Sequence, residues 1–227
     1  MIIPEFNYPE EKAFDLDDFR DMDYYAVKNY DLPIELMMEN AGLQLANLTA
    51  SLIEKHQVVK IGIGNGNNGG GGLVAARRLA AWGYSIYLDT FTDITKELPT
   101  KQLERALKFG VKTDIITKPD LWIDAYLGFS QRLPLSQSLL AKIEEANSCN
   151  SIKISLDIPT GFLGDLKSPH FHANKILSLA APKKILYRLS LENEVFIADL
   201  GIPVEVYKQF GRTIPPFHIG NLLKLKR

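Results

Sequence analysis

The chain has 227 residues, of which 46% are hydrophobic and 23% are charged, and its formal net charge is −1. These values suit one large globular α/β domain and exclude the overall positive field of proteins that bind nucleic acid or anionic membranes. Cys149 is the only cysteine, so no internal disulfide can form, which suits a reducing compartment. A secretory leader and an apolar run of roughly 20 residues are both absent, so we expect a cytoplasmic protein without a membrane partner.

Helical patterns dominate the first part of the chain. Residues 1–16 are acidic and contain two prolines, which predicts a loosely ordered lead-in. Residues 17–30 can form a helix with Asp17 as its N-cap, and Pro33 can start a second helix that runs to about Lys55. The second helix carries an apolar stripe that is predicted to face the core and consists of Leu36, Met37, Ala41, Leu45 and Leu48.

A glycine-rich segment at residues 62–72 is the most informative feature of the chain. It contains seven glycines and the adjacent Asn67 and Asn68. An apolar, β-branched run at residues 58–61 precedes it, and a helical pattern at residues 73–82 follows it. A strand, a glycine-rich loop and a helix in this order bring backbone N–H groups close to a phosphate. The segment therefore predicts a loop that binds a phosphate or a nucleotide.

Strand and helix patterns alternate along the rest of the chain. Helices are predicted at residues 98–109 and 135–146. Strands are predicted at residues 84–88, 111–116, 121–124, 152–157, 175–179, 184–187 and 195–198, and residues 210–227 are predicted to be a C-terminal tail. Such alternation is typical of a mostly parallel sheet with helices on both faces. We therefore expect a single domain over residues 1–227, folded as a Rossmann-like three-layer αβα sandwich.

Polar residues follow three of the predicted strands, at residues 65–72, 124–132 and 157–161. Because the carboxyl ends of parallel strands meet at one edge of a sheet, we expect Asn67, Asn68, Asp124 and Asp157 around one crevice. Asp157 is the strongest catalytic candidate, since a partly desolvated carboxylate can act as a general acid or base.

Asn68, Asp124 and the hydroxyl of Thr160 could form an all-oxygen site for a hard cation. The asparagines could equally be turn residues that tolerate left-handed geometry, and Asp124 could cap a helix or bond a loop. The sequence leaves these alternatives open.

Other polar residues carry weaker signals. Lys183 follows Pro182, and we interpret it as a surface lysine in preference to a phosphate ligand. His170 and His172 lie in a polar loop without a third ligand, so we assign no zinc site. Cys149 has no neighbouring histidine that could activate it, so we do not interpret it as a nucleophile.

A dehydrogenase is one alternative function. Gly62 and Gly64 begin an incomplete dinucleotide fingerprint, and Asp89 ends the next predicted strand, where a ribose contact would be expected. The segment between Gly64 and the following helix is too long for that class, which makes this alternative weak.

Five segments carry a family resemblance. In chain order they are Met38-Glu39-Asn40-Ala41-Gly42, Gly64-Asn65-Gly66-Asn67-Asn68-Gly69-Gly70, Asp124-Ala125 with Gly128, Asp157-Ile158-Pro159-Thr160-Gly161, and Ala181-Pro182-Lys183 with Asp199-Leu200-Gly201-Ile202-Pro203. Over about residues 17–208 the chain resembles the NAD(P)H-hydrate epimerases, also called YjeF N-terminal domain proteins.

The resemblance implies an enzyme that interconverts the R and S forms of NAD(P)H hydrated at C6 of the nicotinamide ring, with Asp157 as the general acid and base. It implies a potassium ion on Asn68, Asp124 and Thr160, a separate dehydratase as the pathway partner, and a possible homodimer to which Met37 and Met38 contribute. The substrate contacts that it implies are Asn67, Asn68, Gly69, Gly70, Gly71, Gly128, Phe129, Ser130, Asp157 and Lys183.

Three departures from the family pattern fall at the expected site. Gly71 replaces an aspartate, and Phe129 and Ser130 replace a threonine and a glycine. Residues 173–178 are Ala-Asn-Lys-Ile-Leu-Ser, so that Asn174 stands where the family pattern has Asp, and Ile176 and Ser178 stand where it has two threonines. The competing interpretation is therefore a non-catalytic nucleotide-binding or scaffold module of the same fold.

Overall fold

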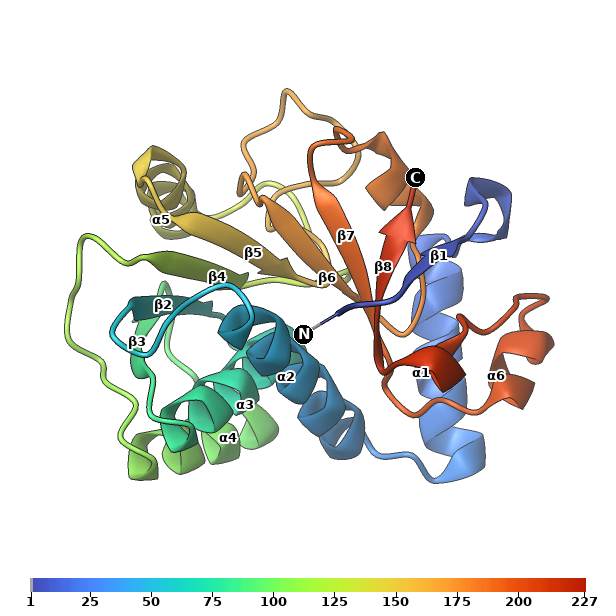
Figure 1. The fold of residues 1–227 in the computed structure, drawn as a ribbon, viewed down its shortest axis with the longest axis horizontal. Helices are drawn as coiled ribbons and strands as arrows, with labels where there is room; N and C mark the ends of the chain where they lie inside the picture. Colours follow the sequence, from blue (N-terminus) through green and yellow to red (C-terminus); the bar gives the residue numbers. More distant parts are fainter. Residues whose placement is uncertain (1) are drawn as a thin grey trace.

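An eight-stranded sheet lies at the centre of the computed structural model, which describes residues 2–227 (Figure 1). Its strands are β1 (Glu5–Asn7), β2 (Val58–Ile63), β3 (Ser85–Thr90), β4 (Leu121–Ala125), β5 (Ile152–Leu156), β6 (Lys175–Leu179), β7 (Glu194–Ala198) and β8 (Leu222–Lys226). The strand order is β1-β8-β7-β6-β5-β4-β2-β3. Only β7 and β8 pair antiparallel among the described strands, so the prediction of a mostly parallel sheet is confirmed.

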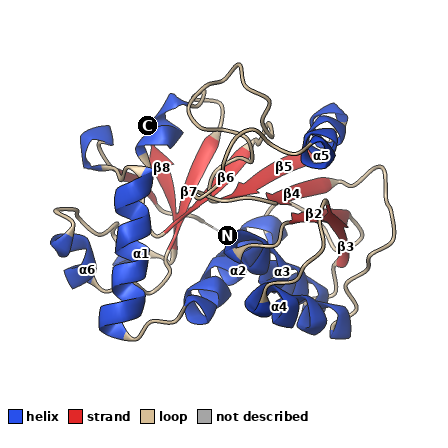
Figure 2. Cartoon of the chain, turned by 180° about the vertical axis from the view of Figure 1, so that it is seen from behind, coloured by secondary structure: helices blue, strands red, loops and turns tan. Residues whose placement is uncertain are grey.

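Helices flank the sheet on both sides. They are α1 (Leu16–Tyr30), α2 (Ile34–Ala50), α3 (Asn67–Ala81), α4 (Glu97–Lys108), α5 (Gln137–Ser148) and α6 (Val204–Gln209). Helices α2, α3 and α4 gather on one face, α5 lies on the opposite face, and α1 and α6 lie beside the other end of the sheet (Figures 1 and 2). None of the helices described in residues 2–227 has the length and hydropathy that crossing a bilayer requires.

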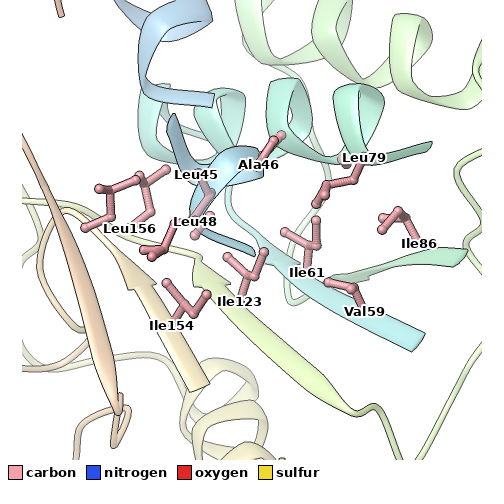
Figure 3. Packing of buried hydrophobic residues seen from close by; sticks show 14 of the residues in the cluster. Leu45, Ala46, Leu48, Val59, Ile61, Leu79, Ile86, Ile123, Ile154 and Leu156 are labelled. Carbon is pink, nitrogen blue, oxygen red and sulfur yellow. The ribbon is translucent and has the colours of Figure 1, made fainter. Parts of the chain in front are cut away.

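Alternate residues of the central strands feed two hydrophobic layers. Ile61 and Ile123 point toward α2 and α3, where they join a cluster that includes Leu48 (Figure 3). Trp122, one residue before Ile123, faces the other way and joins a cluster that includes Ala146 of α5. Side chains alternate along a strand, so the face of β2, β4 and β5 toward α2 and α3 is apolar, while the other face also carries Lys60, Lys153 and Ser155, which are buried.

Both ends of the described chain join the sheet, which corrects the expectation of a loose lead-in and a C-terminal tail. Strand β8 lies between β7 and β1, antiparallel to the first and parallel to the second. Lys224 of β8 lies 2.5 Å from Glu194 of β7. A three-residue strand such as β1 forms only because β8 offers it a partner, and a local pattern does not contain that information.

The glycine-rich segment is divided between a turn and a helix. Helix α3 begins at Asn67 rather than at the predicted Leu73, and Gly69, Gly70, Gly71 and Gly72 lie in its buried first turns. A Cβ at Gly72 would lie 2.6 Å from Ala125 Cβ on β4. The glycines therefore let the start of α3 approach the sheet.

Two predicted strands are absent from the described chain. In residues 111–116 only Lys112 bridges to Tyr87, and Ile115 is 93% exposed, so after the buried Val111 this segment has no apolar face that would hold it in the sheet. Residues Lys184–Arg188 form a 3₁₀-helix. The backbone N–H of Lys184 donates to Phe14 O in the N-terminal region, which draws this segment away from the sheet.

The first two helices also differ from prediction in detail. The N-cap of α1 is Asp15, so Asp17 lies in the first turn. Helix α2 ends at Ala50 instead of Lys55, and Leu36 is exposed, whereas the other members of the predicted stripe are buried.

Candidate active site

A pocket of about 310 Å³ lies beyond the carboxyl ends of β2, β4, β5 and β6. Helix α1 contributes Phe19 and Asp23 to its wall, and α2 contributes Met37 and Met38. Strand β2 separates β3 from β4, so the chain changes direction across the sheet at this point. Ligands of open α/β sheets bind at such a position.

Asp157 lies at the floor of the pocket, directly after β5, and is 1% exposed. Its Oδ1 lies 2.8 Å from Lys183 Nζ, and its Oδ2 accepts a 2.7 Å hydrogen bond from the backbone N–H of Phe129. The φ angle of Asp157 is 74°. A left-handed conformation costs a non-glycine residue on the order of 1 kcal/mol and is concentrated at functional sites. The carboxylate is therefore held between a cation and a backbone N–H.

Lys183 is fully buried, so its interpretation as a surface lysine was wrong. Its Nζ donates to Ser178 Oγ at 3.1 Å and to Leu179 O at 3.0 Å, and it lies 3.7 Å from the centre of the Phe19 ring. Burial lowers the pKa of Lys183, and the negative charge of Asp157 opposes that shift. A lysine with a lowered pKa releases its proton more readily, so this buried pair can hold and move a proton.

Asp23 is a pocket residue that the sequence analysis missed. It is half-buried on α1, and burial raises its pKa to about 6, while Lys183 lowers that pKa and Asp157 raises it further. A signal was present, because Asp23 stands four residues after Phe19 and three before Ala26, both of which are buried. That spacing places an acidic side chain beside the buried face of the helix.

The asparagines of the glycine-rich segment open α3 at the pocket. The side-chain N–H group of Asn68 donates to Leu127 O at 2.8 Å and to Leu156 O at 3.3 Å. Its Oδ1 is buried and has no hydrogen-bond partner within the described residues. Asn68 thus ties α3 to the ends of β4 and β5 and leaves one oxygen unsatisfied.

Asp124 and Thr160 lie together beneath the pocket wall. Asp124 is fully buried, and its carboxylate accepts bonds from Thr160 Oγ1 at 2.5 Å, from Thr160 N at 2.8 Å and from Ser155 Oγ at 2.8 Å. Burial raises the pKa of Asp124 to about 6 even though these bonds oppose it. Thr160 Oγ1 also accepts from Leu127 N at 3.1 Å, and Leu127 O is the carbonyl that Asn68 bonds. The three oxygen-bearing residues therefore meet around Leu127.

The loop after β4 places Gly128, Phe129 and Ser130 along the pocket. The Phe129 ring packs edge to face on Phe19 at 5.1 Å between ring centres. This large residue therefore fills space between the loop and α1, and its backbone N–H is the group that bonds Asp157.

The four glycines that open α3 have different roles. Gly71 lines the pocket, and a Cβ there would lie 3.1 Å from Leu156 Cδ2. Gly70 packs against Met38, and Gly69 packs against the Gly64 carbonyl. Gly69 and Gly70 thus serve helix packing, while Gly71 faces the ligand space.

Asp89, Met37 and Met38 do not have the roles that the sequence suggested for them. Asp89 accepts a 2.5 Å hydrogen bond from Tyr126 Oη and lies 2.7 Å from Lys142 Nζ, so a buried network occupies the carboxylate considered for a ribose. Met37 and Met38 are 3% and 4% exposed, which removes them from any dimer face of this conformation. In residues 2–227, no group of three or more His, Cys, Asp or Glu side chains is arranged to hold a metal.

A mostly parallel α/β sheet with a pocket at its switch point and a glycine-rich helix start is an arrangement in which many proteins bind nucleotides. The family model described as YjeF-related protein N-terminus matches residues 34–185. The chain belongs to this family.

Named relatives extend the comparison. An NAD(P)H-hydrate epimerase of Dehalogenimonas lykanthroporepellens is 34% identical over 91% of this chain and 89% of its own, and one of Rhodopirellula baltica is 32% identical over 85% of each. A bifunctional NAD(P)H-hydrate repair enzyme Nnr of Thermofilum pendens is 32% identical over 63% of this chain and 30% of its own. The crystal structure of the yeast protein ynu0 superposes with a TM-score of 0.82 at 22% identity, over 94% of this chain and 100% of its own, and shows the same fold.

Proposed function

We propose that this chain is an NAD(P)H-hydrate epimerase, an isomerase that interconverts the R and S forms of hydrated NADH and NADPH. The observation that carries the proposal is Asp157, which lines the pocket beside the start of α3 and is paired with the buried Lys183 behind it. Relatives named for this activity match most of the chain. The departures at Gly71 and Phe129 leave the pair and its backbone contact in place.

Epimerisation at C6 requires the bond between carbon and the hydroxyl oxygen to break and to form again on the other face of the ring. Asp157 takes a proton from Lys183 and delivers it to the hydroxyl, which leaves as water, and the lone pair of the ring nitrogen stabilises the resulting cation. Lys183 can release that proton because burial lowers its pKa. Asn67, Asn68, Gly71 and the loop from Gly128 hold the dinucleotide around this point.

Asn68, Asp124 and Thr160 would hold the potassium ion. The buried Oδ1 of Asn68 has no partner in the described chain, and the Asp124 carboxylate and Thr160 hydroxyl supply further oxygen donors, which hard cations prefer. A bound cation would neutralise Asp124 and stabilise the loop that carries Phe129. Asp157 and Lys183 carry the proton chemistry.

The proposed reaction also suggests where the chain acts and which enzyme uses its product. One relative is named a bifunctional NAD(P)H-hydrate repair enzyme. We place the present chain in the cytoplasm, beside a separate dehydratase that consumes the S hydrate. A homodimer remains part of the proposal, with a surface other than Met37 and Met38.

The test is epimerisation of purified R hydrate of NADH, coupled to a dehydratase specific for the S form, with the spontaneous rate subtracted. We expect the chain to accelerate epimerisation and Asp157→Asn to lower the rate by about 10²–10⁴-fold, the range for loss of a general acid or base. Asp114→Asn, a change at an exposed aspartate, is the matched control and should retain full activity. A wild-type chain that gives only the background rate would favour the non-catalytic module.

A further inference from the structure

The pocket contains a second carboxyl group, Asp23. Asp157 alone serves the step in which the hydroxyl leaves one face of the ring, so that step gives Asp23 no role. Asp23 comes from α1, whereas Asp157 follows β5, so the two groups reach the ligand space from different elements. Helix α1 lies outside the region that the family model matches, residues 34–185. Asp23 therefore lies outside the matched sequence.

We propose that Asp23 is a second catalytic residue, the base that accepts the proton of the water returning to the opposite face of the ring. The inference rests on the proposed epimerase function. A single carboxylate fixed on the pocket floor reaches one face of a bound ring. Inversion at C6 needs proton transfer at both faces. Among the described residues that line this pocket, Asp23 is the carboxylate other than Asp157.

Lys183 contacts Asp157 and acts on Asp23 through its charge. Its Nζ is 2.8 Å from Asp157 Oδ1. The shared neighbour Phe19 lies one helical turn before Asp23 and stacks on the lysine at 3.7 Å. Burial and these two charges, rather than a hydrogen bond, shift the pKa of Asp23, so its oxygens are available to a ligand.

The proton balance then closes. Asp157 loses one proton to the departing hydroxyl, and the carbon–oxygen bond breaks to give water and the cation. Water adds to the other face, a new carbon–oxygen bond forms, and Asp23 takes the released proton. Lys183 supplies the proton that Asp157 gives up. Asp23 releases its proton to solvent and the Asp157–Lys183 pair takes one up, which restores the resting state. The reverse sequence converts S to R with the two carboxylates exchanged in role.

Other charged or titratable groups also face this space. They are Arg20 and Tyr24 on α1, Lys96 at the start of α4, Tyr126 after β4, and Asp157, behind which Lys183 is buried. Burial raises the pKa of Asp23 to about 6. At pH 7 to 8 Asp23 is therefore ionised and able to act as a base, and below about pH 6 it is not.

The experiment follows inversion and oxygen exchange separately in ¹⁸O-labelled water. Asp23→Asn keeps Asp157 and Lys183, so the hydroxyl should still leave and return to the same face. We expect label exchange at C6 to remain within about tenfold of the wild-type rate while inversion falls about 10²–10³-fold, as for loss of a general base. A purely structural defect would reduce both rates together and leave their ratio unchanged.

Controls separate the possible outcomes. Asp21→Asn changes an exposed aspartate on the same helix and should alter neither rate, and Asp23→Ser provides a second variant if the asparagine variant does not fold. A wild-type chain that accelerates neither process overturns the proposed function. A wild-type chain that accelerates both, with an unchanged ratio in both Asp23 variants, overturns the role of Asp23 alone.

Discussion

Lys183 Nζ lies 2.8 Å from Asp157 Oδ1, and the two side chains are 0% and 1% exposed. Breaking a buried ion pair by removing one partner leaves an uncompensated charge, which typically costs 3–5 kcal/mol. Asp157 also has a positive φ, so the site accepts backbone strain in order to place this carboxylate. The pair therefore links stability to the proposed proton chemistry.

Lys183→Met should lower the free energy of unfolding by about 3–5 kcal/mol at pH 8. Without the ammonium, the buried Asp157 carboxylate has no cation beside it. Denaturant titrations of the wild type and the variant measure the loss. Equal stabilities would contradict this account, and Asp157→Asn with Lys183→Met should recover part of the deficit because it removes the unpaired charge.

Asp124 should give the protein a second, separable pH dependence in potassium-free buffer. Burial raises the folded-state pKa of Asp124 to about 6, above its value of about 3.9 in an unfolded chain. The contribution of Asp124 to stability is therefore present below about pH 4 and is lost as pH rises through about 6. The stability of the wild type minus that of Asp124→Asn should decrease between pH 4 and pH 7 and then level off. A difference that rises over this range would contradict the prediction.

Potassium should stabilise the chain more at pH 8 than at pH 5, because a cation binds the ionised form of Asp124. At a concentration 100 times the dissociation constant, the gain is about 2.7 kcal/mol. Melting temperatures in potassium chloride and in choline chloride at equal ionic strength measure it. Asn68→Ala removes the unsatisfied oxygen and should abolish the difference between the salts. An equal gain in both salts would show that no specific cation site exists.

Gly42→Ala should destabilise the fold although alanine favours a helix by about 1 kcal/mol over glycine. A Cβ at Gly42 would lie 2.5 Å from Val74 Cβ and 2.8 Å from Gly71 O, so α2 and α3 would have to separate. Overpacking of this kind costs about 1–3 kcal/mol. Thermal denaturation should show the loss, and Asn47→Ala, at a half-exposed position of the same helix, should be close to neutral.

Asp89→Asn should reduce stability without changing the KM for the hydrate. The change weakens the bonds to Tyr126 Oη and Lys142 Nζ, at a cost of about 1–3 kcal/mol for a buried charged partner. Asp93→Asn, at an exposed position nearby, is the control for stability and should change neither quantity. An increase of tenfold or so in KM at unchanged stability would instead assign Asp89 to a ribose.

The order of strands and helices in the central region follows from local pattern. Residues 58–61, 121–124 and 152–157 are predicted as strands, because their β-branched and large apolar residues suit the buried strands of a parallel sheet. The sequence also placed Asp157 at the end of a strand, which is where the structure has it.

The pairing of distant strands and the packing of helices could not be predicted from local sequence pattern. Strand β1 depends on β8, more than two hundred residues away in the chain. The glycines at the start of α3 suggested a loop, because glycine is common in loops, but their backbones are helical and pack against Gly64, Met38 and Ala125. A local pattern records conformational preference and does not record which neighbour will be close.

By itself, the sequence determined the α/β class, the family motifs and the carboxylate that follows β5, because periodicity and short motifs are local properties. The tertiary structure decided the partner of that carboxylate. Lys183 looked like a surface charge in the sequence, and only the packing of Phe19 and Ser178 around it buries it against Asp157. Asp23 enters the pocket for the same reason, since the docking of α1 on the sheet sets its distance from the other charges. Burial and proximity determine protonation, and both arise from contacts between segments that are distant in the chain.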